Sequence, residues 1–124
     1  MKISQDINYR PTWAETDLSA IRHNFNQVKA LINKGTKILV AVKANAYGHG
    51  MLEVSNTLIR QGVDYLGVGT TDEAVFLRRQ GVRVPILMLG SILPSEIEAI
   101  VKYRISQTVG NMELARALIV IASV

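Results

Sequence analysis

The sequence predicts an α/β fold that corresponds to the first half of an eight-stranded (β/α)8 barrel of the TIM type. Short apolar runs rich in branched residues alternate with segments whose apolar residues recur at spacings of three and four. Hairpin signals are absent between the apolar runs, so the strands are expected to run parallel through right-handed connections. The expected strand centres lie about 20–28 residues apart, close to the ~30 residues per barrel unit.

Each expected element has its own local signal. Leu18, Ile21 and Phe25 begin a helical face, which Gly35 follows as a stop signal. Thr70 has the capping-box spacing to a glutamate three residues later, and Asn111 is a candidate cap for the last helix. The expected strands cover residues 38–42, 65–68, 85–89 and, more weakly, 105–109. The expected helices cover residues 18–32, 51–61, 71–80, 94–101 and 112–121.

The length of 124 residues supplies four such units, about half of a barrel. Half a barrel leaves two unpaired sheet edges, which folded domains usually avoid. A small open doubly wound sheet is the alternative, because that fold can be complete at this length. The apolar stretch 119–124 favours a chain truncated before barrel closure. We expect residues 1–16 to form an N-terminal segment, with a possible extra strand at 11–16, and residues 17–124 to form the partial barrel.

Composition excludes several classes of function. Hydrophobic residues make up 48% and charged residues 19%, which is not a disordered composition, and no apolar run is long enough to cross a membrane. A soluble cytoplasmic protein is therefore expected. The chain has no cysteine, and two histidines, His23 and His49, are too few for a histidine-rich metal site. The net charge of +4 comes from scattered basic residues without interleaved aromatics, so no nucleic acid partner is expected.

Residues 42–50, Val-Lys-Ala-Asn-Ala-Tyr-Gly-His-Gly, carry the chemistry. Lys43 directly follows a buried strand, at the carboxyl end where barrel active sites lie. An amine at this place can form a Schiff base, although a lysine that leaves the strand and reaches solvent would fit the pattern too. Gly48 and Gly50 permit tight turns and the close approach of backbone donors to an anion such as phosphate.

This segment resembles the cofactor-attachment signature of the alanine racemase family. Three flanking blocks, residues 10–24, 69–74 and 85–90, are also similar to the family in kind and order, so the resemblance extends across nearly the whole chain. It implies an α/β barrel followed by a mainly β domain, in a homodimer whose active sites are shared between subunits. It further implies that Lys43 forms a Schiff base with pyridoxal 5′-phosphate and that Tyr47 helps to hold the cofactor phosphate.

The resemblance implies interconversion of L-alanine and D-alanine, which supplies D-alanine for peptidoglycan. In the family, the second acid/base group is a tyrosine of the partner's C-terminal domain, so this chain alone is expected to be inactive. A broad-specificity or other amino-acid racemase, and a non-catalytic or decayed cofactor-binding fragment, remain alternatives.

Asp72 and Glu73 are interpreted as favourable charges at a helix start. Leu87 and Leu89 could approach the cofactor or serve only as core.

Overall fold

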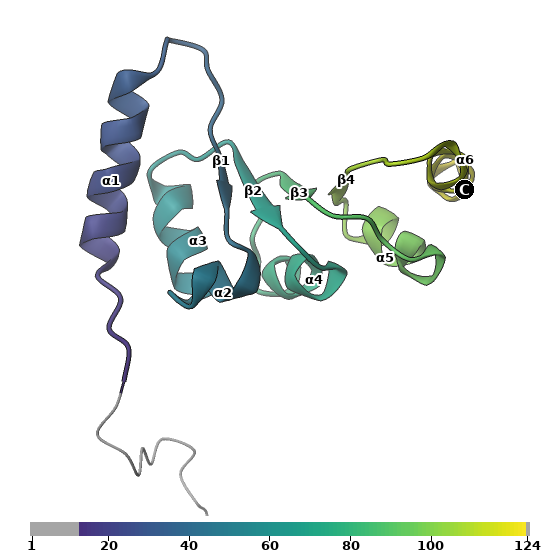
Figure 1. The fold of residues 1–124 in the computed structure, drawn as a ribbon, viewed down its shortest axis with the longest axis horizontal. Helices are drawn as coiled ribbons and strands as arrows, with labels where there is room; N and C mark the ends of the chain where they lie inside the picture. Colours follow the sequence, from purple (N-terminus) through teal and green to yellow (C-terminus); the bar gives the residue numbers. More distant parts are fainter. Residues whose placement is uncertain (1–12, 124) are drawn as a thin grey trace, which may run out of the picture.

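The computed structural model describes residues 13–123, which form one parallel sheet with helices on one side (Figure 1). Strands β1 (Leu39–Ala41), β2 (Tyr65–Val68), β3 (Ile86–Met88) and β4 (Ser106–Gln107) pair in the order β1-β2-β3-β4. A doubly wound sheet reverses its strand order, whereas a barrel adds each strand beside the previous one. The open sheet is therefore an arc of a barrel, as the sequence predicts.

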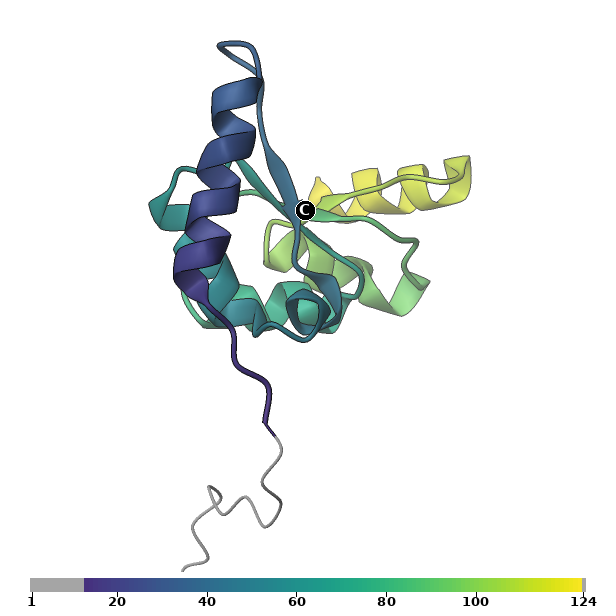
Figure 2. The same cartoon turned by 60° about the vertical axis from the view of Figure 1, so that its left-hand side comes forward.

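The helices alternate with the strands. They are α1 (Leu18–Leu31), α2 (Lys43–Tyr47), α3 (Met51–Arg60), α4 (Thr71–Arg79), the 3-10 turn η1 (Pro94–Glu96), α5 (Ile97–Lys102) and α6 (Met112–Ala122). The expected helices match these bounds within a few residues, except that the sequence pattern does not predict α2. Helix α1 packs on α3 beside β1, and α6 packs on α5 at the β4 end (Figure 2).

The core lies between the sheet and α3, α4 and α5. Leu66 and Val68 of β2 and Ile86 and Met88 of β3 are fully buried on the helix-covered face. Each such side chain contributes roughly 1.5–3 kcal/mol relative to an exposed one. On the other face Leu39 is 39% exposed, and that face corresponds to the barrel interior.

Side-chain caps begin three of the helices. The Asp17 carboxylate accepts hydrogen bonds from the Ser19 hydroxyl at 2.6 Å and from the Ser19 and Ala20 amides, and these bonds lower the pKa of Asp17. The Thr70 hydroxyl accepts from the Glu73 amide at 3.3 Å, and the Asn111 side chain accepts from the Leu114 amide at 2.8 Å. The predicted caps at Thr70 and Asn111 are confirmed.

The N-terminal segment is described only in part. Residues 13–17 form neither helix nor strand, while residues 11 and 12 of the suggested extra strand lie outside the described residues. The division of the chain at residue 16 stays a prediction. None of the helices within residues 13–123 has the length and apolar content needed to cross a bilayer.

Candidate functional site

Lys43 lies at the carboxyl end of β1, where the sequence places it. The preceding residue, Val42, still belongs to the sheet ladder, because its amide donates to the Gly67 carbonyl at 2.8 Å. The Lys43 side chain is exposed, and its hydrocarbon part lies beside Gly69 at the end of β2. A Cβ placed on Gly69 would be 3.5 Å from Lys43 Cβ and 3.6 Å from Lys43 Cδ. The side chain therefore runs across the end of the sheet toward β2.

The segment after Lys43 is a left-handed helical turn, which the sequence pattern does not predict. Ala44, Asn45, Ala46 and Tyr47 have φ values between 51° and 55°. For residues with a Cβ this conformation costs about 1–2 kcal/mol per residue. Four consecutive residues of this kind must be held by surrounding contacts, and backbone strain of this type concentrates at functional sites.

Hydrogen bonds made by residues 43–50, the Lys43 loop, among themselves and with the adjoining residues offset part of that cost. The Ala46 amide donates to the Val42 carbonyl at 2.8 Å, and the Gly50 amide donates to the Asn45 carbonyl at 3.0 Å. The Asn45 side-chain oxygen accepts from the Met51 amide at 2.8 Å and so satisfies the first donor of α3. Asn45 thus ties the turn to the next helix.

The glycines of the Lys43 loop provide shape. Gly48 and Gly50 have φ values of 88° and 92°, so the expectation that they permit tight turns is confirmed. Their suggested role as phosphate donors is not supported, because the Gly48, His49 and Gly50 amides all donate to carbonyls inside the loop. A side chain of this loop that could donate to an anion is Tyr47, which is 61% exposed.

Glu73 has a larger role than its position at a helix start suggests. One carboxylate oxygen, Oε1, accepts from the Ala44 amide at 2.7 Å, and the other, Oε2, accepts from the Gly69 amide at 2.8 Å. The same side chain therefore joins the loops that follow β1 and β2. The interpretation of Glu73 as only a favourable helix-dipole charge is too narrow, because the carboxylate reaches back beyond its own helix.

Glycines allow close packing at the end of the sheet beside Lys43. A Cβ on Gly67 would lie 3.0 Å from both Leu39 Cδ2 and Leu89 Cδ1, and a Cβ on Gly90 would lie 3.5 Å from the Gly69 carbonyl oxygen. Leu89 is 38% exposed and lies over Gly67 on the uncovered face. Lys43 therefore lies against the Gly69 backbone, which in turn lies beside Gly90.

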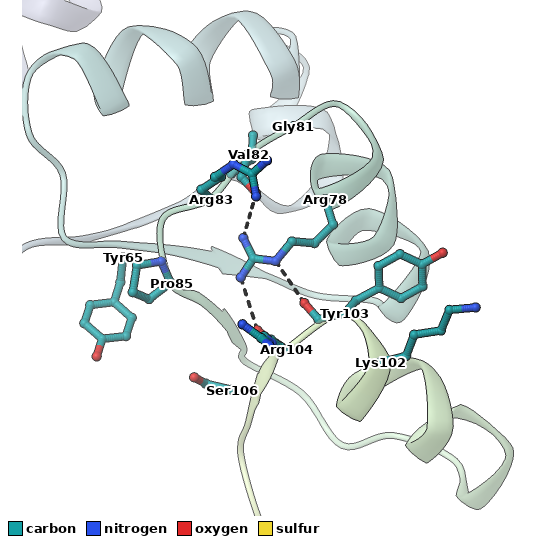
Figure 3. Close-up of a pocket in the computed structure, with 10 residues that line it drawn as sticks. All are labelled: Tyr65, Arg78, Gly81, Val82, Arg83, Pro85, Lys102, Tyr103, Arg104 and Ser106. Carbon is teal, nitrogen blue, oxygen red and sulfur yellow. Dashed lines mark hydrogen bonds between the residues drawn. The ribbon is translucent and has the colours of Figure 1, made fainter. Parts of the chain in front are cut away.

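A cavity of about 670 Å³ lies at the other end of the strands (Figure 3). Its lining includes Tyr65, Pro85 and Ser106, which stand at or beside the amino ends of β2, β3 and β4. Lys43 follows the carboxyl end of β1, so this cavity is separate from the lysine.

Arg78 occupies the centre of that cavity. Its guanidinium donates to the carbonyls of Tyr103 at 3.0 Å, Val82 at 2.9 Å, Val84 at 2.8 Å and Arg104 at 3.2 Å. Figure 3 shows the guanidinium between the loops that precede β3 and β4. Burial lowers the pKa of Arg78. Because these hydrogen bonds engage the backbone of both loops, Arg78 fastens the two loops together.

Comparisons with known proteins point to one family. The family model "Alanine racemase, N-terminal domain" matches residues 16–123. The alanine racemase of Halothermothrix orenii is 49% identical over 109 residues, which cover 88% of this chain and 29% of that protein. The solved alanine racemase of Clostridium difficile 630 superposes with a TM-score of 0.89 at 41% identity, over 93% of this chain and 31% of that one.

A third protein, the Bacillus anthracis alanine racemase solved with bound L-Ala-P, superposes with a TM-score of 0.85 at 36% identity. That match covers 93% of this chain and 30% of the other. The chain thus spans about three-tenths of the length of these relatives.

Proposed function

The chain belongs to the alanine racemase N-terminal domain family, and on this premise we propose that it forms the cofactor-holding part of a pyridoxal-phosphate-dependent alanine racemase. The proposed reaction interconverts L-alanine and D-alanine and supplies D-alanine for peptidoglycan in the cytoplasm. The relatives named alanine racemase support this reaction.

The position of Lys43 is the observation that carries the proposal. Its side chain lies against the Gly69 backbone at the end of β2, and Gly90 lies beside Gly69. An aromatic aldehyde needs an amine beside backbone that carries no bulky side chain, and Lys43 with the neighbouring Gly69 and Gly90 provides this. Tyr47 adds an exposed hydroxyl on the same loop, suited to donate to a phosphate oxygen. The residues present therefore fit pyridoxal 5′-phosphate.

Lys43 has two roles in this proposal. Its amine would hold the cofactor covalently through the aldehyde, and when free it would remove or return the α-proton on one face of the substrate. When bound, the cofactor supplies the electron-withdrawing ring that acidifies this proton. Tyr47 would donate its hydroxyl to the cofactor phosphate and so hold the cofactor in one place relative to Lys43.

Racemisation also requires an acid/base group on the opposite face of the substrate. We propose that a partner subunit of a homodimer supplies this group from its C-terminal domain. We further propose that the segments which follow in the longer relatives supply the arginine for the substrate carboxylate. The 124-residue chain alone is then expected to hold the cofactor without racemising alanine.

The first test is covalent trapping. The chain is mixed with pyridoxal 5′-phosphate, reduced with borohydride, digested and analysed by mass spectrometry. We expect one labelled site, Lys43, and loss of that label in Lys43→Ala. Lys37→Ala is the matched control, because Lys37 precedes the same strand at its other end, with its ammonium 6.0 Å from the centre of the Tyr65 ring. A label that survives in Lys43→Ala at wild-type level, or that spreads evenly over the lysines, would refute the assignment.

The second test concerns the reaction. A chimera joins this segment to the remaining part of the Halothermothrix orenii protein, and its products from L-alanine, L-serine and L-lysine are separated by chiral chromatography. We expect racemisation of alanine, lost in Lys43→Ala. Preference for another amino acid would favour the broader racemase. No activity in a folded chimera that binds the cofactor would favour a non-catalytic fragment.

A further inference from the structure

Glu73 lies where the two loops at the carboxyl end of the sheet meet. Its carboxylate accepts the Ala44 amide at 2.7 Å and the Gly69 amide at 2.8 Å, and both distances are typical of charge-assisted hydrogen bonds. The donors come from loops that follow different strands, β1 and β2. Within residues 13–123, no other charged side chain forms hydrogen bonds to both of these loops.

The Ala44 hydrogen bond acts on the backbone of Lys43. The Ala44 amide belongs to the peptide unit that begins at the Lys43 carbonyl carbon, and Ala44 is the first residue of the left-handed turn. Holding this amide fixes the rotation of the peptide plane, and with it the direction in which the Lys43 Cα–Cβ bond leaves the strand. The turn would otherwise relax, because alanine and tyrosine disfavour positive φ.

The Gly69 hydrogen bond acts on the surface beside the Lys43 side chain. A Cβ on Gly69 would lie 3.5 Å from Lys43 Cβ and 3.6 Å from both Lys43 Cδ and Glu73 Oε2. The Glu73 carboxylate therefore holds two backbone segments: the Gly69 backbone beside the Lys43 side chain, and the peptide that joins Lys43 to Ala44.

The ordinary role of such a glutamate is different. In a capping box, the residue at this position returns a hydrogen bond to the amide of the capping threonine. Here Thr70 caps α4, but the Glu73 carboxylate reaches past it to Gly69 and Ala44. Asp72 also lies in the first turn of α4 with the same charge and is exposed. Both acids thus place a negative charge at the helix start, whereas Glu73 is the one whose carboxylate accepts hydrogen bonds from Gly69 and Ala44.

We propose that Glu73 is a positioning residue for Lys43, which fixes both the peptide that carries the lysine and the surface beside it. Its backbone effect is independent of the proposed function, whereas its effect on cofactor binding rests on that function. Glu73→Ala removes both acceptors. Glu73→Gln keeps one, because the amide oxygen accepts and the NH2 group does not.

The test combines amide hydrogen exchange with cofactor titration. In Glu73→Ala we expect the Ala44 and Gly69 amides to exchange at least about tenfold faster, with Glu73→Gln in between, because each loses a charge-assisted bond. We expect the yield of borohydride-trapped label on Lys43, measured at limiting pyridoxal 5′-phosphate, to fall by a similar factor. Asp72→Asn, the matched control, should change either measurement by less than about twofold.

Equal exchange changes in Glu73→Ala and Asp72→Asn, or an increase spread uniformly over the core amides, would overturn the positioning role. If Glu73→Ala does not fold, the same comparison is made with Glu73→Gln. If the wild-type chain takes no cofactor while the exchange pattern holds, the proposed function fails and the backbone role of Glu73 stands.

Discussion

Replacing Arg78 by methionine should destabilise the fold by more than is usual when a single polar side chain is removed. The guanidinium joins four backbone carbonyls, of Val82, Val84, Tyr103 and Arg104. A hydrogen bond to a charged group contributes about 1.5–3 kcal/mol. The contributions of the four hydrogen bonds do not simply add, because water reaches part of this site and can replace some of the bonds in the variant. We expect a loss of about 2–4 kcal/mol from the free energy of unfolding.

The measurement is urea unfolding followed by circular dichroism, with an unchanged dependence on urea as the sign that the unfolded state is not altered. Arg79→Met is the matched control. Arg79 is the next residue of α4 and is exposed, and its Nε donates to the Tyr103 hydroxyl at 3.3 Å. The Arg79 variant should therefore lose much less stability. If the Arg78 and Arg79 variants unfold at the same urea concentration, the four carbonyl contacts do not stabilise the protein as argued.

Two further predictions concern a cap and a glycine. The pKa of Asp17 is lowered below 3.8, so its contribution to α1 is fully present above about pH 3.8 and is lost as the pH falls through its lower folded-state value. Asp17→Asn should remove this acid dependence of helix content in circular dichroism, and parallel acid transitions in both proteins would contradict it. Gly67→Ala should cost about 1–3 kcal/mol in urea unfolding, because its methyl group meets Leu39 and Leu89 at 3.0 Å. Wild-type stability of that variant would show that the leucines move aside freely.

Local signals account for the regular part of the fold. Strand β2 has the bounds that the sequence predicts, residues 65–68, and the caps at Thr70 and Asn111 make the expected hydrogen bonds. These features depend on apolar spacing and on neighbours a few residues away, so they can be read directly from the chain. The same alternation predicts parallel strands, but it also fits a doubly wound sheet, and the order β1-β2-β3-β4 that decides for the barrel is seen only in the structure.

The left-handed turn cannot be predicted in that way. Its residues include two alanines, for which local preference favours a right-handed helix. The conformation depends on a contact between residues 29 positions apart, Ala44 and Glu73. Arg78 presents the same case, because its partners Tyr103 and Arg104 are 25 and 26 positions away. Such contacts exist only once the units of the barrel have packed.

Lys43 and Glu73 illustrate the difference between local and distant signals. Lys43 is predictable because an amine directly after a buried apolar run is a local anomaly. For Glu73, the capping-box spacing already explains a glutamate at this position. Its hydrogen bonds with the Ala44 and Gly69 amides cannot be predicted from the residues next to it. The second acid in the same turn, Asp72, is the available signal, since one carboxylate is enough to interact with the helix dipole.

The contacts that shape the surroundings of Lys43 all come from β1 to α4 and the end of β3. The left-handed turn is held by Glu73 and Asn45, and the backbone beside the lysine belongs to Gly69, with Gly90 next to it. None of them requires the barrel to be closed. In the proposed enzyme, attachment of the cofactor at Lys43 would need only neighbouring βα units, whereas the proposed racemisation would need a second group facing the substrate from the other side. Because these two requirements fall on different parts of the proposed enzyme, cofactor binding and turnover should be separable by experiment.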